Sequence, residues 1–547
     1  MKSNIGVFMG VMAYMPYGAS GIIIRVESDI RRGIPGIDIT GLAEGAVREA
    51  RERVRAAFRN SGFNFPLDRI LINLAPAGMK KEGAALDLPI ALSVMAAAGI
   101  VQISGNILVM GELELSGRVR PVHGVLAAIA AGLNEGIREF IVPVENAREA
   151  AILAGKGARF TAAENLQGAV HALFIREEKG ELPVSNNYKT DVKTFDHSDD
   201  TVGDFINVHG QWVYKRALEI AAAGGHNVLV FGPPGAGKTM LARRMPSIMA
   251  PLTPDEAVEV TRLHSLAGPL SNNGVFINHL ITHPPLRAPH HSASAEGILG
   301  GGKIPRPGEI SLAHFGVLFL DEAPEFKVNV LQALREPLED RVIRIVRVEG
   351  PVRLPAEFQL LMSANACPCG RLGMRTAEFT DEADNKGEFN ESHTCFCSPE
   401  EINRYWRKFG GALLDRVEIR TAILPPKISE ISISSASGES STVIAERVKA
   451  AVNIQQHRYK RTGIRRNTLL GSDKIKAFCP MSQKAENTLQ KAISRLGLSG
   501  RAYHGIIRVA RTIADLEAKE VLETEHVLEA VQHRRLGDDP WDIIGIN

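Results

Sequence analysis

The sequence predicts an α/β protein of several domains, and three observations support this fold class. The chain has 547 residues, which exceeds what a single hydrophobic core usually organises. An apolar strand candidate at 226–231 leads directly into a glycine-rich loop and then a helix-like run, a pattern typical of a parallel α/β sheet. From residue 443 to about 535 helical periodicity dominates. An α/β core followed by a separate helical region is therefore expected.

The first predicted domain, residues 1–175, alternates strand-like and helix-like runs. Residues 21–26 form a strand candidate. Residues 48–59 carry apolar side chains at helical spacing among charges, which predicts an amphipathic helix. Residues 86–100 are almost wholly apolar, so we expect a helix that is buried on all sides.

Two polar stretches predict linkers. Residues 176–204 are rich in charge and have too little apolar surface to fold alone. Residues 427–442 are rich in serine. These linkers bound an α/β core at 205–426 and a helical domain at 443–535, while the last eleven residues, 537–547, receive no assignment.

The apolar run at 5–15, which follows Lys2, superficially resembles the core of a signal peptide. However, Gly6, Gly10 and Pro16 interrupt this region and a strand follows directly, so secretion is not expected. No apolar stretch approaches the roughly 18 residues that a membrane span needs. The odd number of cysteines, five, fits a reducing compartment better than a disulfide framework, which predicts a cytoplasmic protein without membrane contact.

The overall composition is ordinary for a globular protein, with 44% hydrophobic and 23% charged residues. The formal net charge of +2 creates no global field that would attract nucleic acid. Any nucleic-acid binding must therefore come from local basic loops.

The glycine-rich loop after the strand at 226–231 matches a complete phosphate-binding loop. In such loops the backbone N–H groups curl around a triphosphate, which requires glycine because a Cβ would obstruct them. Lys238 would reach the outer phosphates and the Thr239 hydroxyl would bind Mg²⁺. The preceding strand and following helix favour this interpretation over a glycine-rich turn between core elements, so ATP and Mg²⁺ are predicted as cofactors. The predicted nucleotide-binding residues are Gly232, Pro233, Pro234, Gly235, Ala236, Gly237, Lys238, Thr239 and Met240.

Two carboxylates follow a second apolar strand. Residues 317–320 are apolar throughout, as in a parallel strand buried on both faces, and Asp321 and Glu322 come next. In parallel sheets, ligands bind at the carboxyl ends of the strands. At that edge Asp321 can hold Mg²⁺ and Glu322 can polarise the attacking water. The pair predicts hydrolysis of a nucleoside triphosphate.

Three further residues fit a ring-forming ATPase better than a solitary kinase. A strand candidate at 360–364 ends at Asn365, which is placed to orient water beside the terminal phosphate. Arg416 follows, and Arg501 and Arg508 are seven residues apart and so share one helical face. Arginine from a neighbouring subunit or a lid stabilises the charge of a phosphoryl-transfer transition state. Each arginine taken alone is also compatible with a solvated surface position.

Several longer stretches resemble one protein family. They are residues 208–211, 215–225, 287–294, 306–314 and 508–516. By these motifs the chain, from its first residue to about residue 535, is similar to magnesium-chelatase-like AAA+ ATPases of the YifB/ComM type.

This resemblance implies an AAA+ phosphate-loop core, a C-terminal helical lid and a homo-hexameric ring with ATP bound between subunits. It places Asn365 at the sensor 1 position, Arg416 at an arginine finger that acts in trans, and Arg501 at sensor 2. The predicted catalytic residues are thus Glu322, Lys238, Asn365, Arg416 and Arg501, and the predicted magnesium ligands are Thr239 and Asp321.

Two segments are candidates for substrate contact. The first surrounds a glycine cluster that favours a mobile loop, and its basic residues are Arg287, His290, His291, Lys303 and Arg306. Buried hydrogen-bonding histidines are the alternative there. The second segment, 341–353, alternates like a hairpin and carries four arginines against one glutamate. It suits sequence-independent contact with phosphate in a central pore, and a hairpin with a solvated arginine face is its alternative.

Four of the five cysteines form two C-x-C pairs, Cys367 with Cys369 and Cys395 with Cys397. Four thiolates can bind Zn²⁺ tetrahedrally, although C-x-C is less typical of zinc sites than C-x₂-C. His393 could replace one thiol, and four reduced structural thiols remain the alternative. We expect Cys479 to be simply buried.

The N-terminal domain also resembles the Lon-type proteolytic fold, which occurs in the recombination protein RadA. The matching stretches are residues 80–87 and 111–121. Lon-type proteolysis needs a serine nucleophile and a lysine base, but the matching positions hold Ala85 and Leu126. The resemblance therefore implies a non-proteolytic Lon-like α+β domain that serves as a scaffold or nucleic-acid platform.

These observations favour an ATP-driven motor on single-stranded or branched DNA. The ComM-type resemblance implies a branch-migration helicase that promotes integration of single-stranded DNA during natural transformation or recombination. The alternative is a chelatase-type ATPase or chaperone that remodels a protein partner during metal insertion. Against it, the chain contains no Asp-x-Ser-x-Ser motif of the metal-adhesion type.

Overall fold

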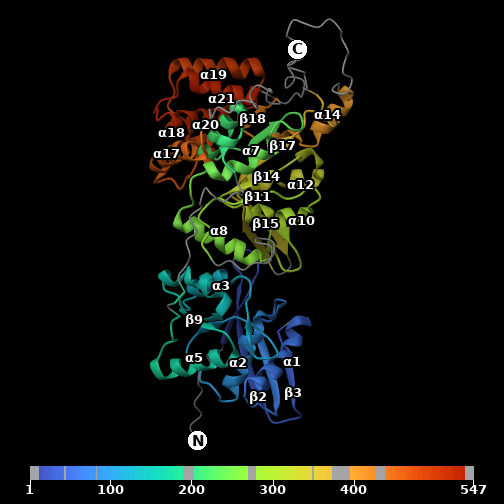
Figure 1. Ribbon diagram of the computed structural model, residues 1–547, viewed down its shortest axis with the longest axis vertical. Coiled ribbons are helices and arrows are strands. Elements are labelled where there is room, and N and C mark those ends of the chain that lie inside the picture. Colours follow the sequence, from blue (N-terminus) through green and yellow to red (C-terminus); the bar gives the residue numbers. More distant parts are fainter. Residues whose placement is uncertain are drawn as a thin grey trace.

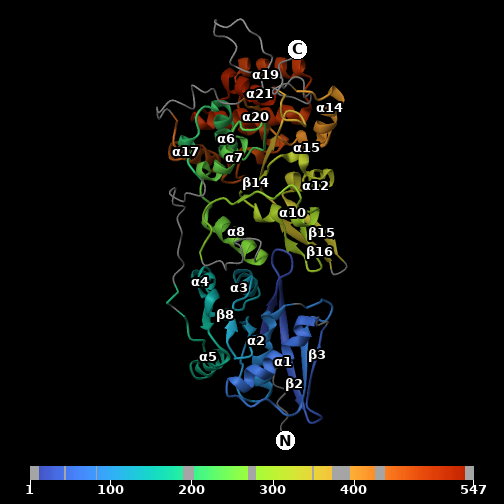
Figure 2. The ribbon, with the colours of Figure 1, turned by 45° about the vertical axis from the view of Figure 1, so that its right-hand side comes forward.

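The computed structural model describes residues 11–41, 45–81, 83–185, 187–188, 203–268, 279–347, 350–372, 395–424 and 438–535. The molecule is elongated and has three successive bodies, coloured blue to teal, green to orange and orange to red along the chain (Figures 1 and 2). The middle body contains a parallel sheet and is flanked by the N-terminal sheet on one side and the C-terminal helices on the other.

The N-terminal body is built on a mixed seven-stranded sheet in the order β3-β4-β2-β1-β5-β8-β9. β2 runs antiparallel to β1 and β4, and the remaining neighbours are parallel. Its strands are β1 (Val11–Met15), β2 (Ile22–Arg31), β3 (Gly36–Thr40), β4 (Arg69–Ala75), β5 (Ile107–Val109), β8 (Glu139–Pro143) and β9 (Arg159–Ala163), beside the small pair β6 (Glu112–Leu113) and β7 (Val119–Arg120).

Helices cover both faces of this sheet because successive strand residues point to opposite sides. One hydrophobic cluster joins the sheet to α1 (Gly45–Asn60), α2 (Asp87–Ala97) and α5 (Leu166–Lys179). The other joins it to α3 (Val125–Asn134) and α4 (Ala147–Ala151). The predicted amphipathic helix and the predicted buried helix are confirmed as α1 and α2, and α2 is buried from its first residue through Met95.

The middle body contains a five-stranded sheet in which every pair of neighbours is parallel. The order is β11-β14-β17-β10-β18, so β17 lies between β10 and β14. The strands are β10 (Val228–Phe231), β11 (Leu286–Arg287), β14 (Val317–Leu320), β17 (Gln359–Ala364) and β18 (Ile419–Ala422). β10, β14 and β17 are wholly buried, which explains the continuous apolar sequences of β10 and β14.

Short helices and two hairpins surround this sheet. The predicted hairpin at 341–353 is confirmed as β15 (Val342–Arg347) paired with β16 (Gly350–Pro355), and a smaller one pairs β12 (Gly300–Gly301) with β13 (Arg306–Pro307). The helices are α6 (Trp212–Gly224), α7 (Lys238–Arg244), α8 (Pro254–Ala267), α10 (Ala295–Leu299), α11 (Glu309–Leu312), α12 (Val328–Ala333), α13 (Arg335–Asp340), α14 (Pro399–Arg407) and α15 (Gly411–Leu414).

The C-terminal body is helical and consists of α17 (Ser441–Tyr459), α18 (Ser472–Phe478), α19 (Gln483–Leu496), α20 (Gly500–Leu516) and α21 (Thr524–Arg535). Apolar residues of α17 and α20 share one core with α6 and with one face of the parallel sheet. Within the described parts of the chain, no helix is both long and apolar enough to cross a lipid bilayer.

The beginning of the first predicted linker is wrong. Helix α5 continues to Lys179, and Arg176 is buried and paired with Glu139 at 2.6 Å. Leu182 is also buried, and Ser185 hydrogen-bonds the neighbouring strand β9. The polar composition concealed this packing because Arg176 is buried together with its counter-ion. Residues 186 and 189–202 of that linker and 427–437 of the second lie outside the described residues.

Candidate nucleotide-binding site

The loop after β10 has the backbone conformation that its glycines allow. Gly235 and Gly237 have φ angles of 77° and 88°, in the left-handed region that glycine enters without steric cost. A Cβ on Gly232 would lie 2.2 Å from the carbonyl oxygen of Ile423, so a side chain cannot fit there. The loop leads directly into α7, whose first residue is Lys238.

The Lys238 ammonium lies inside this loop. It donates hydrogen bonds to the carbonyl oxygens of Gly232 at 2.6 Å and Pro233 at 2.9 Å, and to Asn365 Oδ1 at 2.9 Å. Burial lowers the pKa of Lys238 to about 8, although two nearby carboxylates oppose the shift. Below that pH the side chain is mainly charged, and it is poorly hydrated, which suits a ligand for phosphate.

A hydroxyl and a carboxylate meet beside the loop. Thr239 Oγ1 lies 2.9 Å from Asp321 Oδ2, and Ser363 Oγ donates to Asp321 Oδ1 at 2.5 Å. The same Ser363 oxygen accepts the backbone N–H of Glu322 at 2.9 Å, and Glu322 has a φ of 50°. Hard oxygen ligands in this arrangement fit Mg²⁺, which takes few protein ligands together with substrate phosphates.

The order of the strands explains why these groups meet. The paired residues Phe231 and Ala364 end β10 and β17, and Leu320 pairs with Met362 on the other side. The loop after β10, Asn365 after β17 and Asp321 after β14 therefore emerge at one edge of the sheet. Four residues predicted from three motifs thus form two neighbouring hydrogen-bonded pairs, Lys238 with Asn365 and Thr239 with Asp321.

Arg416 and Arg501 also lie together, but their contacts are separate from those of Lys238 and Asp321. Both donate to one carboxylate, with Arg416 Nη2 on Glu339 Oε2 and Arg501 Nη2 on Glu339 Oε1 at 3.0 Å. Arg416 also donates to the carbonyl oxygen of Ala412 at 2.5 Å. The two arginines follow α15 and begin α20, so Glu339 on α13 joins the middle body to the C-terminal helices.

Three family models match most of the chain. They are described as magnesium chelatase, subunit ChlI, over residues 204–431; subunit ChlI of Mg-chelatase, over 26–146; and magnesium chelatase, subunit ChlI C-terminal, over 438–534. The protein YifB of Salmonella typhimurium is 38% identical over 523 residues, which cover 95% of each chain. The competence protein ComM of Haemophilus influenzae is 38% identical over 523 residues, or 95% of this chain and 96% of its own. The chain belongs to the YifB/ComM family of magnesium-chelatase-like proteins.

This membership confirms the resemblance inferred from the motifs. Part of this YifB/ComM-family chain is also similar to Lon protease of Geobacter metallireducens, with 23% identity over 155 residues, 27% of this chain and 18% of that protein. At the two positions predicted to have lost catalytic groups, Leu126 is fully buried, and Ala85 packs against the same hydrophobic cluster.

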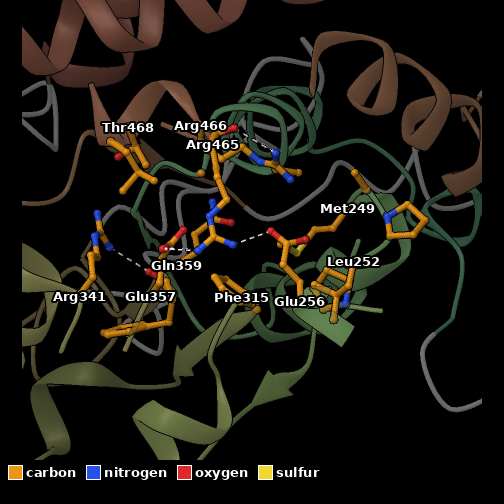
Figure 3. A pocket seen from close by; sticks show the side chains of 18 residues that line it. Met249, Leu252, Glu256, Phe315, Arg341, Glu357, Gln359, Arg465, Arg466 and Thr468 are labelled. Atoms are coloured by element: carbon orange, nitrogen blue, oxygen red, sulfur yellow. Dashed lines mark hydrogen bonds and ion pairs between the residues drawn. The ribbon is translucent and has the colours of Figure 1, made fainter. Parts of the chain in front are cut away.

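A cavity lies at the opposite edge of the parallel sheet, where Gln359 begins β17 (Figure 3). There Arg465 bridges Glu256 at 2.7 Å and Glu357 at 2.9 Å, and its guanidinium lies 4.0 Å from the ring centroid of Phe315. Arg465 therefore ties α8 and the sheet to the C-terminal body. The phosphate loop follows the other end of the strands, so the two sites are separate.

The glycine-cluster segment shows which basic residues remain accessible. Arg287 is a poor candidate for phosphate contact because it forms a two-pronged ion pair with Glu309, at 2.7 and 2.9 Å. His290 is exposed and His291 partly exposed, with ring centroids 4.0 Å apart, so the alternative of buried histidines is wrong. Lys303 and Arg306 are exposed.

Two of the four arginines in the hairpin make contacts within the protein, whereas contact with phosphate was predicted for this segment. Arg341 precedes β15 with a φ of 58°, and its guanidinium donates to the carbonyl oxygen of Phe358 at the base of the sheet. Arg344 pairs with Glu336 at 3.2 Å and with Asp340. The exposed arginines that carry no ion pair among the described residues of the hairpin are Arg347 and Arg353.

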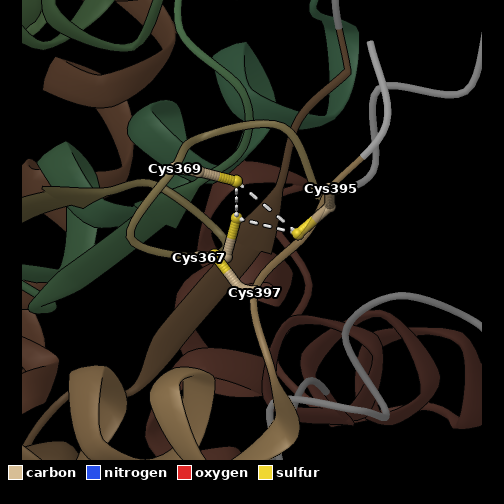
Figure 4. Close-up of side chains that lie close together, drawn as sticks. All are labelled: Cys367, Cys369, Cys395 and Cys397. Carbon is tan, nitrogen blue, oxygen red and sulfur yellow. Dashed lines mark hydrogen bonds between the residues drawn. The ribbon is translucent and has the colours of Figure 1, made fainter. Parts of the chain in front are cut away.

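The four predicted zinc ligands converge in the structure. Figure 4 shows the two C-x-C pairs facing one another, and their sulfur atoms all lie within 4.8 Å of each other. Cys367 Sγ is 3.3 Å from Cys369 Sγ and 3.6 Å from Cys395 Sγ. A tetrahedral zinc site with Zn–S bonds of about 2.3 Å has sulfur atoms about 3.8 Å apart, so the cluster has the required size. His393 lies outside the described residues, and Cys479 is buried elsewhere, as predicted.

Three residues of the site were not singled out from the sequence. Ser363 supports both acidic residues, Glu339 joins the two arginines, and the hydroxyl of Tyr405 accepts the backbone N–H of Asn365 at 3.3 Å. A polar residue inside an otherwise apolar strand was a usable signal for Ser363. Glu339 gave none, because its partners are remote in the sequence.

Proposed function

We propose that this YifB/ComM-family protein is an AAA+ ATP hydrolase that works as a hexameric motor on DNA. The observation that carries the proposal is that two hydrogen-bonded pairs, Lys238 with Asn365 and Thr239 with Asp321, lie beside a complete phosphate loop. Membership of a family whose models are named for a magnesium chelatase subunit supports the ATPase assignment.

Each residue of the site has its own role in ATP hydrolysis. The loop 232–240 holds the phosphates with Lys238 as their cation, and Thr239 and Asp321 hold Mg²⁺. Bound Mg²⁺ would neutralise charge on the phosphates. Glu322 acts as general base for the attacking water, and Asn365 orients that water. Ser363 keeps both acidic residues in place.

The ring is inferred from the two arginines. Arg416 is anchored by Glu339 and Ala412, and neither of these groups contacts Lys238 among the described residues. An arginine held away from its own phosphate loop suits action on the ATP of a neighbouring subunit. Arg501, on the same carboxylate, is proposed to act beside it as sensor 2.

The domain layout follows the sequence boundaries except at the end of the first domain. We propose a non-proteolytic Lon-like domain that extends to about residue 185, an AAA+ core at 205–426 and a helical lid at 443–535, with linkers between them. Alanine and leucine at positions 85 and 126 cannot perform serine–lysine chemistry. The free cysteines suit a reducing compartment, which favours a cytoplasmic protein.

The DNA substrate is inferred from accessible arginines and from the similarity to the competence protein ComM. We propose branch migration during integration of single-stranded DNA in transformation or recombination. The deciding experiment compares ATP hydrolysis by the purified protein alone, with single-stranded DNA and with a forked junction. Stimulation by DNA and ATP-dependent movement of the junction are expected. An active ATPase that neither binds forked DNA at low salt nor moves it would contradict the proposal.

The hairpin provides a sharper test of DNA contact. We expect the double variant Arg347→Ala/Arg353→Ala to bind forked DNA more weakly and to reduce the slope of log affinity against log salt by about 2, or about 1 per phosphate contact. ATP hydrolysis without DNA should change little. Arg344→Ala is the matched control, because that arginine is already paired with Glu336 and Asp340. If the double variant keeps the salt dependence of the wild type, the hairpin does not contact DNA.

A second candidate function is remodelling of a protein partner during metal insertion. It is favoured by the names of the three family models, which all refer to a magnesium chelatase subunit. This function predicts ATP hydrolysis that responds to a protein partner and is indifferent to DNA, so the same ATPase comparison separates the two candidates.

We further propose that the four-cysteine cluster (Cys367, Cys369, Cys395 and Cys397) binds Zn²⁺. Purified protein is expected to contain about one zinc per chain, because four thiolates complete a tetrahedral site. Metal analysis should show loss of zinc in Cys367→Ser/Cys369→Ser and its retention in Cys479→Ser, since Cys479 lies outside the cluster. If wild-type protein prepared without chelators contains no metal, the alternative holds and the cluster consists of four reduced structural thiols.

A further inference from the structure

The four-cysteine cluster lies against the phosphate loop. Cys367 is two residues beyond Asn365, and the turn from Cys367 to Gly370 is closed by a hydrogen bond from the Gly370 N–H to the Cys367 carbonyl oxygen at 3.0 Å. A Cβ built on Gly370 would lie 3.2 Å from Pro234 Cδ of the phosphate loop. The turn that supplies half of the cysteines therefore touches the loop that holds Lys238.

The other two cysteines precede a helix that contacts the end of the same strand. Cys395 and Cys397 precede α14, whose first turn is fixed by a reciprocal capping box. From this helix Tyr405 accepts the backbone N–H of Asn365, and Trp406 Nε1 donates to the Ala366 carbonyl oxygen at 3.0 Å. The cluster thus joins the end of β17 to α14 at the residues that flank Asn365.

The same helix leads toward the arginine finger. After α14 the chain passes through α15 to Arg416, and Lys408 donates to the carbonyl oxygen of Pro324, two residues beyond Glu322, at 2.8 Å. The helix α14 and Lys408 at its end therefore contact the segments that carry Asn365 and Glu322, and the same stretch of chain leads to Arg416. Four thiols alone give this region only weak S–H contacts, whereas a metal ion would bind all four sulfur atoms strongly.

We propose that metal in the four-cysteine cluster is a clamp on the ATPase site, so that ATP turnover depends on metal occupancy. The metal would act by positioning its neighbours. It would hold Asn365 between Lys238 and α14 and keep the Cys367–Gly370 turn in contact with Pro234. This inference rests on the proposed ATPase function and adds a requirement for a metal that takes no part in the chemistry of the phosphates.

The first test withdraws zinc from wild-type protein with a high-affinity chelator, removes the chelator and restores Mg²⁺ before ATP hydrolysis is measured. We expect kcat to fall at least about tenfold and to recover when one equivalent of Zn²⁺ is added. Hydrogen exchange should rise at the end of β17 and in α14 but stay unchanged in β4 of the N-terminal sheet. Cys479→Ser serves as the control for thiol damage and should behave as wild type at every step.

A second variant tests the coupling without touching the metal. Tyr405→Phe removes only the hydroxyl that accepts from Asn365, so it should keep one zinc per chain and lower kcat about fivefold, the effect of one hydrogen bond. Its apparent affinity for ATP should change little.

The possible failures are distinguishable. If zinc leaves and kcat changes less than about twofold, the clamp is overturned and the ATPase proposal stands. If zinc never binds, the clamp is likewise overturned. If the zinc-loaded wild type hydrolyses no ATP, the proposed function itself fails.

Discussion

Glu322→Gln is expected to reduce ATP turnover by about 10²–10⁴-fold, the usual contribution of a general base, while binding of ATP and Mg²⁺ is retained. The amide has the same size as the carboxylate but cannot polarise the attacking water. Its backbone should stay in place, because Ser363 accepts the N–H of residue 322 and holds Asp321 independently of the side chain. The variant should therefore trap assembled, ATP-bound rings, which can be measured by sedimentation with and without nucleotide.

Two comparisons make this result specific. Glu325→Gln changes an exposed carboxylate three residues away and should leave turnover near the wild-type value. Lys238→Ala should instead weaken nucleotide binding, because a positive charge on the phosphates is lost. Turnover at the wild-type rate in Glu322→Gln would show that another group polarises the water.

Residues of the candidate nucleotide site could be grouped from the sequence because each has a local signal. Each functional residue follows an apolar strand, and parallel strands bring their carboxyl ends to one edge whatever the length of the chain between them. Lys238, Asp321 and Asn365 could thus be assigned to one site from separate motifs. Their direct contact, Lys238 Nζ to Asn365 Oδ1, further depends on β17 lying between β10 and β14, which no single motif specifies.

Contacts between residues that are remote in the sequence could not be predicted in this way. Arg501 and Glu339 are 162 positions apart and meet only because the tertiary fold brings the start of α20 close to the end of α13. The hairpin pattern counts arginines but not their surroundings, so Arg341, which turns toward the base of the sheet, looked like Arg353, which is exposed. Burial of Arg176 with Glu139 likewise extended the first domain into a stretch whose composition is typical of a linker.

Arg416→Ala is expected to bind ATP normally but to hydrolyse it about 10³–10⁵-fold more slowly, the range for loss of an arginine finger. The residue is anchored on Glu339 and Ala412, away from the contacts of Lys238, so its loss should leave the subunit's own loop intact. ATP binding by fluorescence and steady-state hydrolysis measure the two effects. Arg407→Ala, an exposed arginine on α14, is the matched control and should remain active.

Mixing variants tests whether the finger crosses a subunit interface. Arg416→Ala subunits have intact loops and Lys238→Ala subunits have intact fingers, so in a head-to-tail ring each can complete the other. In an equal random mixture about a quarter of the interfaces pair an intact loop with an intact finger, and activity should return toward that fraction of wild type. The two variants separately should stay inactive at the same total concentration. Mixed rings that remain inactive, although labelled subunits demonstrably exchange, would leave Arg416 as a support for its own subunit, because a residue acting in trans must be replaceable by its neighbour.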